Sequence, residues 1–295
     1  KREKMIALSL AWFALKRMPR ILVLIFNIVS IFLTIFLLVG CYNSSQQSTF
    51  LARYEFNKQS PMYNVVTTSF NSSDTTKGLQ NIIIRSGYLG VCVDNIPANY
   101  DPEETICFSR KNISNVALYD ELNIKVFNIR SSNNSSATNS TNLNILDLAH
   151  STSVEVIHPY VLMATVILSI LMFCLVVYVT IPKIPFKSKL NNILLLLAPV
   201  LVLIWGIGAM WTHVGINASA NFVPDASMNI IKVRKGKKAA TMSWFAFSFL
   251  LLDCIILWIL YFRDRKSLSE EIDKVKNNHY DGKYASDGST LGYKV

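Results

Sequence analysis

Residues 241–262 read TMSWFAFSFLLLDCIILWILYF, an apolar run that contains one charged residue, Asp253. A helix needs about 20 such residues to cross the hydrocarbon core of a bilayer. Three further runs of similar length carry no charge, at residues 21–39, 160–181 and 193–211. Only 16% of the chain is charged, whereas a soluble domain usually has about 25%. The sequence therefore predicts an α-helical membrane protein with four transmembrane helices.

The first run and the segment before it have alternative interpretations. A signal peptide has an apolar region of about 7–15 residues, shorter than this run, and the sequence GCY that follows is a poor cleavage site. We therefore expect an uncleaved span. Residues 5–15 are apolar and flanked by basic residues, so residues 1–20 are predicted to lie along the membrane surface. The alternative is an extension of the first span that breaks at Pro19.

Basic residues are unevenly distributed between the loops. Residues 1–20 carry six basic residues and one acidic residue, and further basic residues follow the second and fourth runs. The positive-inside rule then makes residues 1–20, 182–192 and 263–295 cytoplasmic, and loops 40–159 and 212–240 external. Because the net charge of +10 is mostly accounted for by these membrane flanks, nucleic acid is not an expected partner.

One basic run conflicts with this topology. Residues 230–238, IIKVRKGKK, lie in the second external loop, where they either contact headgroups or an acidic partner, or form a solvated loop. Glycosylation sequons decide in favour of the topology, because all of them lie in the two external loops. The expected glycosylation sites are Asn71, Asn112, Asn133, Asn134 and Asn139.

The first external loop is long enough to be a domain. Short segments rich in β-branched and aromatic residues predict strands, and turn residues separate them. These segments are residues 48–56, 64–70, 79–86 and 104–110. Residues 116–129 fit either a helix or a pair of strands. Residues 131–142 are polar and of low complexity, which predicts disorder. Residues 143–160 are expected to form a helix at the membrane surface.

Three of the five cysteines lie in residues 40–159, and two of them lie well inside this external domain. Cys92 and Cys107 face the oxidising side and lie on predicted strands, so we expect a disulfide between neighbouring strands. Free thiols or a metal pair are the alternatives, although no histidine lies close enough to complete a zinc site. Cys174 and Cys254 lie within spans and are expected to act as small apolar residues. The pairing of Cys41 is open.

The motif GYLGVC resembles a motif of a known family. Four spans, a large first external loop, this motif and a second cysteine downstream resemble the claudin-like superfamily. Within it, the chain looks closest to the fungal pheromone-induced calcium-regulator and membrane-fusion family, the factor-induced gene family, and the PalI-like proteins are the nearest competitor. The W-x-x-W form that precedes the cysteines in claudins is missing, which argues against a tight-junction role. The motif residues are Gly87, Tyr88, Leu89, Gly90 and Cys92.

The resemblance implies a fold and a function. The fold is an extracellular β-sheet, residues 40–159, packed on a left-handed four-helix bundle. The function is that of a multi-pass plasma-membrane protein that promotes low-affinity calcium influx and membrane fusion during mating. Both termini are expected in the cytoplasm.

Two sets of carboxylates are candidates for interaction with a cation. Asp94, Asp101, Glu103 and Glu104 form an acidic stretch, and carboxylates are preferred calcium ligands. Their spacing matches no known calcium loop, and a solvated hairpin tip is the alternative. Asp253 lies in the middle of a span, where an ionisable residue usually faces a bundle interior or a water-filled path. It is alternatively a packing residue, with Asn27 as a polar neighbour.

The sequence lacks the common enzyme motifs, so we expect no catalytic residues, no enzyme activity and no cofactor, with calcium only as a transported or weakly bound ion. Two functions remain. The first is a regulator or component of calcium influx. The second is a non-conducting structural subunit that organises a membrane domain or braces a larger complex. The expected partners are the lipid bilayer and either further copies of the chain or a larger membrane-protein complex.

Overall fold

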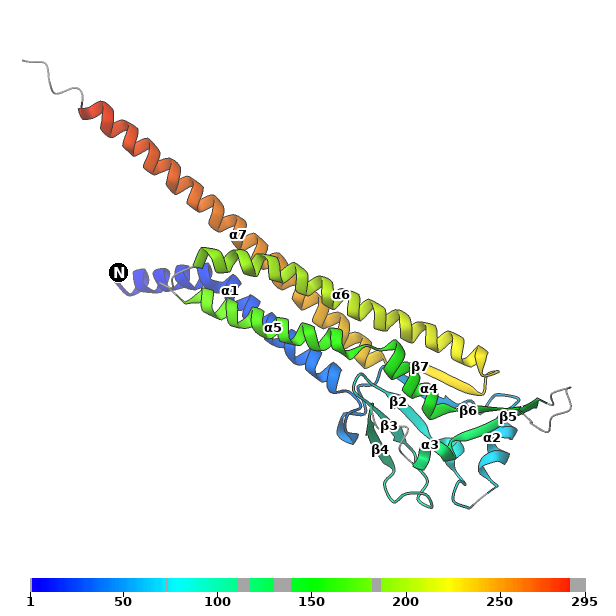
Figure 1. The fold of residues 1–295 in the computed structure, drawn as a ribbon. Coiled ribbons are helices and arrows are strands. Elements are labelled where there is room, and N and C mark those ends of the chain that lie inside the picture. The colour runs from blue at the N-terminus through cyan, green and yellow to red at the C-terminus, as the bar shows by residue number, and fades with distance from the viewer. Residues whose placement is uncertain (1, 73, 111–116, 130–138, 182–186, 287–295) are drawn as a thin grey trace, which may run out of the picture.

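A computed structural model describes residues 2–72, 74–110, 117–129, 139–181 and 187–286. Four long helices form a bundle, and a small sheet lies at one of its ends (Figure 1). The helices are α1 (Arg2–Val39), α5 (Pro159–Thr180), α6 (Lys187–Ala226) and α7 (Lys237–Ser286). Each contains an apolar segment long enough to cross a membrane. The described residues therefore form a predominantly helical protein with four candidate spans.

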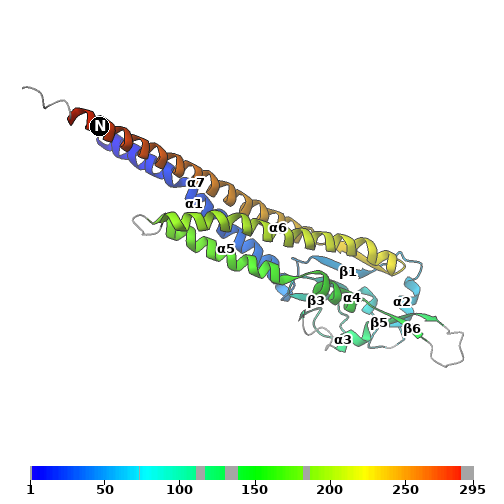
Figure 2. The same ribbon diagram turned by 45° about the horizontal axis from the view of Figure 1, so that its top comes forward.

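The helices pack as a closed set of neighbours. Helix α1 packs against α5 and α7, and α6 packs against the same two helices. The ends of α1 and α7 that are remote from the sheet extend beyond the rest of the bundle, as Figure 2 shows. At about 1.5 Å per residue, the 40 residues of α6 reach twice the thickness of the hydrocarbon core, about 30 Å. Part of α6 therefore lies outside the bilayer.

The sheet combines strands from both loops. Its order is β4-β3-β2-β1-β7, and every neighbouring pair is antiparallel. The strands are β1 (Ala52–Phe56), β2 (Ile83–Ser86), β3 (Gly90–Asp94), β4 (Thr105–Ser109) and β7 (Ile231–Lys235). Along β1, buried residues alternate with half-buried ones, as expected of a strand with one face on the core.

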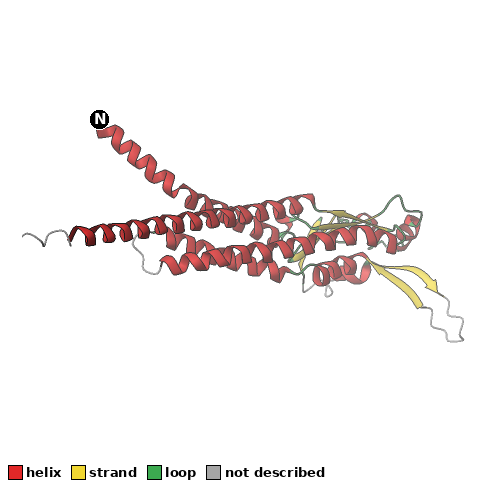
Figure 3. Cartoon of the chain, turned by 90° about the horizontal axis from the view of Figure 1, so that it is seen from above, coloured by secondary structure: helices red, strands yellow, loops and turns green. Residues whose placement is uncertain are grey.

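Smaller elements surround this sheet. A second hairpin, β5 (Asn123–Ile129) with β6 (Asn139–Asn144), projects beyond the rest of the domain (Figure 3). The short helices are α2 (Tyr63–Phe70), α3 (Ala117–Glu121) and α4 (Ile145–Ser151), with 3₁₀ turns at Ser44–Gln46 and Leu79–Asn81 and a π-helical turn at Thr152–Val156. The helix predicted within residues 143–160 is present as α4 and the π-helical turn that follows it, and the chain then continues into α5.

Several predicted boundaries were wrong. Residues 64–70 form helix α2 instead of a strand, because Val66 and Phe70, one turn apart, are both buried. The span predicted at 193–211 continues as helix to Ala226, and Ile216 in this continuation is buried. The basic run in loop 212–240 is not an irregular solvated loop, since it contains strand β7 at the sheet edge.

Two further predictions concern chain segments. Residues 2–39 form one continuous helix, α1, with Pro19 inside it, so the chain does not break at Pro19 as one alternative required. The end of the segment predicted to be disordered, residues 131–142, belongs to strand β6, and its remainder up to residue 138 lies outside the described residues.

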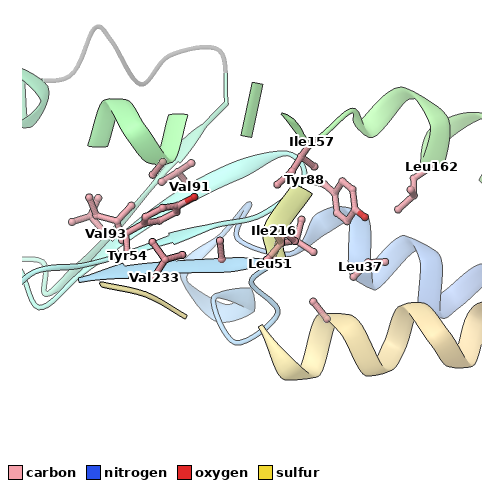
Figure 4. Close-up of a cluster of buried hydrophobic side chains, with 14 of the residues drawn as sticks. Leu37, Leu51, Tyr54, Tyr88, Val91, Val93, Ile157, Leu162, Ile216 and Val233 are labelled. Atoms are coloured by element: carbon pink, nitrogen blue, oxygen red, sulfur yellow. The ribbon is translucent and has the colours of Figure 1, made fainter. Parts of the chain in front are cut away.

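The hydrophobic core runs from the sheet into the bundle. Figure 4 shows Tyr88 at the boundary, between the sheet and the helical ribbons, with Leu37, Ile157 and Ile216 around it. These four side chains are 0–7% exposed. The sheet and the bundle therefore share one core, and the position of one restrains the other.

Candidate functional site

A face of polar residues on α1 points into the bundle. Asn27, Ser30 and Thr34 are spaced by three and four residues, so they lie on the same side of the helix. All three are at most 3% exposed. Polar side chains are rare inside membrane helices and usually have a structural or functional role there.

Hydrogen bonds connect this face to two other helices. Ser30 Oγ donates to the carbonyl oxygen of Ala246 on α7 at 3.3 Å. Trp205 Nε1 on α6 donates to Thr34 Oγ1, also at 3.3 Å. These bonds hold α1 in a defined rotation relative to its neighbours, because a rotated helix would bury the same groups without partners.

Asp253 on α7 lies at the level of Asn27 on α1, and its side chain is fully buried. Asn27 is the polar side chain that interacts with it, although neither side chain makes a hydrogen bond of standard geometry. An ion pair between Arg20 and Asp264, with a distance of 3.2 Å, joins the same two helices farther from the sheet. Asp253 has no comparable basic partner among the ion pairs of the described residues.

This pair does not make a complete calcium site. Ca²⁺ takes six to eight oxygen ligands, whereas Asp253 and Asn27 together offer three side-chain oxygens. No group of three or more His, Cys, Asp or Glu side chains suited to a metal occurs in the described part of the chain. A cation at Asp253 would need further oxygens from water or from another protein.

The acidic stretch of the first loop is not assembled into one site. Asp94 lies within β3, is 4% exposed and approaches Arg85 at 2.9 Å. Asp101 is half-buried, and Glu103 and Glu104 are exposed outside the strand. Burial raises the pKa of Asp94, and the neighbouring Arg85 guanidinium partly opposes this shift. Asp94 is thus part of the sheet interior, and the other three carboxylates belong to the connection between β3 and β4.

The two cysteines of the sheet are directly opposite each other. Cys92 on β3 is paired in register with Cys107 on β4, and a disulfide joins them. Cys41, which follows α1, is a free and buried thiol. Its burial raises its pKa to about 12, so it is a poor nucleophile.

The glycines of the GYLGVC motif have a steric role that sequence reasoning did not identify. A Cβ atom on Gly87 would collide with the carbonyl oxygen of Gly40, and one on Gly90 would collide with that of Cys41. Both contacts are with the chain that leaves α1. The motif glycines therefore allow the β2–β3 hairpin to sit directly on the end of the first transmembrane helix.

Two tyrosines attach the sheet to helical segments. Tyr88 of the motif donates to Thr212 Oγ1 on α6 at 3.1 Å, and Tyr54 on β1 donates to Thr152 Oγ1 at 2.7 Å. Both phenols are at most 1% exposed. Burial raises the pKa of each tyrosine to about 12, so both stay protonated as donors. The sequence contains no signal for these long-range pairs.

Comparison with known proteins identifies the family. Residues 66–263 match the family described as "Ca2+ regulator and membrane fusion protein Fig1". The chain belongs to the Fig1 family. It is also 58% identical over 300 residues to the Factor-induced gene 1 protein of Saccharomyces cerevisiae, a match that covers 99% of this chain and 100% of that protein. No solved structure matches it.

Membership in the Fig1 family places the chain among fungal proteins of calcium regulation and membrane fusion, which are not an enzyme family. The matched region begins within α2 and ends within α7. It includes the disulfide and Asp253 but not Asn27.

The glycosylation predictions concern several positions in the first loop. Asn71 is exposed at the end of α2, and Asn139 begins β6. Asn112, Asn133 and Asn134 lie outside the described residues. Glycosylation at these five asparagines stays a prediction.

Proposed function

We propose that this Fig1-family chain regulates low-affinity Ca²⁺ influx across the plasma membrane of mating cells through Asp253, and that it acts within a larger assembly. The proposal rests on the observation that Asp253 is fully buried inside the helical bundle, where the interacting polar side chain is Asn27. An ionisable group in such a position is expensive to maintain. A purely structural bundle would be better packed with an apolar residue there.

The proposed orientation places the sheet outside the cell and both termini in the cytoplasm, in a claudin-like arrangement. The excess of basic residues in segments 1–20 and 263–295 supports it. The disulfide between Cys92 and Cys107 supports it independently, because disulfides persist on the oxidising side of the plasma membrane. Protease protection of the termini in sealed vesicles tests this orientation.

The incomplete oxygen set around Asp253 supports a regulator in preference to a self-sufficient pore. Three side-chain oxygens are too few for a dehydrated Ca²⁺ ion. We therefore propose that further copies of this chain, or a channel-forming partner, supply the conducting path. No resident cofactor and no nucleic-acid partner are part of this proposal.

The experiment compares Ca²⁺ uptake in mating cells that carry the wild-type chain, Asp253→Asn or Asp101→Asn. The first variant removes the charge and nearly preserves the volume, and the second is a matched control at a more exposed site. Surface levels are measured in parallel. We expect uptake to fall only in Asp253→Asn. Unchanged uptake at equal surface level would overturn the role of Asp253.

A second measurement separates a regulator from a pore. Purified wild-type chain in liposomes should give no Ca²⁺ flux if a partner provides the path. Flux that is present in the wild type and lost in Asp253→Asn would show that the chain conducts, and would replace the regulator proposal with a pore that includes Asp253.

A further inference from the structure

A cavity opens between the sheet and two of the transmembrane helices. Its volume is about 190 Å³, and its walls come from the segment before β1, the β2–β3 turn, α6 and the start of α7. The apolar part of the wall includes Leu51, Ile216, Ala239, Ala240 and Trp244. An apolar cavity of about 150 Å³ is large enough to bind benzene, so this one has room for a segment of a hydrocarbon chain.

The mouth of the cavity is basic. Lys235 at the end of β7 and Lys237 at the start of α7 both line it, and both are exposed. His213 and Asn217 add polar groups from α6. None of the described residues that line the cavity is Asp or Glu. The site thus combines an apolar interior with a cationic entrance, which complements a molecule that has an anionic head and an apolar tail.

The cavity also lies at the depth of a membrane interface. Trp244, half exposed, lines it and packs edge-on against His213, with 6.3 Å between the ring centroids. Tyr160 and Trp211, at the sheet-side ends of their apolar runs, are 69% and 60% exposed. Exposed Trp and Tyr residues collect where the hydrocarbon core meets the headgroups. The entrance therefore faces headgroups and the interior faces acyl chains.

From this combination we propose that the cavity binds one phospholipid of the sheet-side leaflet. One acyl chain enters between α6 and α7, and the phosphate lies between Lys235 and Lys237. The two lysines come from different elements, a strand and a helix, and Leu51 precedes β1. The bound lipid thus contacts the sheet and the bundle at once, and its occupancy restrains the same junction as Tyr88, which also lines the cavity.

The proposal is tested by native mass spectrometry of the full chain released from nanodiscs that contain equal amounts of phosphatidylcholine and phosphatidylserine. The wild type should retain one phospholipid, with a preference for phosphatidylserine. A lysine near an anionic lipid contributes about fivefold in binding. The double variant Lys235→Gln with Lys237→Gln should therefore lose about thirtyfold of this preference. The exchange Lys232→Gln with Lys58→Gln is the matched control, since neither residue lines the cavity.

A second variant tests the apolar interior. Ala240→Phe fills the cavity and should abolish retention, whereas Ala164→Phe on an exposed part of α5 should not. If Ala240→Phe does not fold, the surface lysine variant still decides the question. Absence of retained lipid in the wild type, or equal retention in both lysine variants, overturns the proposal. Selective retention of an added sterol over phospholipid also overturns it. None of these outcomes depends on Ca²⁺ uptake.

Discussion

The phenol oxygen of Tyr88 lies 3.1 Å from the hydroxyl oxygen of Thr212, and this contact joins residues that are 124 positions apart. Tyr88 belongs to the turn before β3, and Thr212 lies where the apolar run of α6 ends. Thr212 in turn donates to the carbonyl oxygen of Gly208 at 2.9 Å. The chain Tyr88–Thr212–Gly208 therefore anchors the sheet to a transmembrane helix.

Replacement of Tyr88 by Phe should weaken this anchor without disturbing its packing. Thr212 keeps its bond to Gly208, so only one hydrogen bond is lost, and we expect a destabilisation of about 1 kcal/mol. Thermal unfolding of the purified protein in nanodiscs measures it. Tyr42→Phe, at an exposed position, is the control. Equal stability of Tyr88→Phe and wild type would show that the bond makes no net contribution.

Gly90→Ala should prevent the sheet from seating on the bundle. The new methyl group would meet the carbonyl oxygens of Cys41 and Phe108, which are backbone atoms and cannot rotate away. We expect loss of surface expression, measured by labelling of intact cells. Gly206→Ala is the matched control, because its methyl group meets only the edge of the Phe247 ring. Normal surface expression of Gly90→Ala would contradict the steric role assigned to the motif.

Removal of the disulfide should destabilise the sheet domain more than the bundle. Cys92 and Cys107 are 15 residues apart, and closing such a loop contributes about 3 kcal/mol in the chain-entropy model. In the double Cys→Ser variant, limited proteolysis should cut the first loop well before the helices. Cys174→Ser serves as a control for loss of a cysteine as such. Identical cleavage rates in all three proteins would argue against this role.

The stability of the sheet should depend on pH through Asp94. Burial raises the pKa of this carboxyl above its ordinary value of 3.8, so the folded chain holds the proton at a pH where the unfolded chain has released it. Stability from this group therefore rises as the pH falls from the raised pKa toward 3.8 and is lost as the pH rises through that window.

The variant Asp94→Asn has no carboxyl group at this position, so the difference between the wild type and the variant isolates the contribution of Asp94. The melting temperature of the wild type, relative to the variant, should increase on acidification through the window. The opposite trend, a relative loss of wild-type stability in acid, would mean that the Arg85 ion pair outweighs burial. Asp101→Asn, at a more exposed position, serves as the control for loss of a carboxyl group as such.

Composition was sufficient to locate the bundle, because a span needs a long apolar run and four such runs are present. Composition was less informative for short segments, where tertiary contacts decide whether a helix or a strand forms. The residues NVVTTSF have high strand propensity, yet they form α2 because two of them, one turn apart, fit the core. In β7 the alternation of buried Ile231 and Val233 with Lys232 and Arg234 was visible in the sequence, but the positive charge dominated its interpretation.

The site was predictable only in part for a similar reason. Asp253 was recognisable as an exception within an apolar run, and Asn27 as the amide of another run. The pairing of Tyr88 with Thr212, and of Trp205 with Thr34, depends on how helices far apart in the chain are rotated against one another. No local spacing encodes that rotation. The acidic stretch suggested a common cation site, but proximity in sequence does not place side chains on one face of a sheet.

The sheet can be completed only after strand β7 has been synthesised, late in the chain. The partner strand β1 is made before α5 and α6, whereas β7 emerges only after α6 and immediately before α7. If α6 enters the membrane in the wrong direction, β7 is left on the opposite side from β1, and the edge of β1 stays open. Completion of the sheet therefore requires that the helices between these strands were inserted in the correct direction.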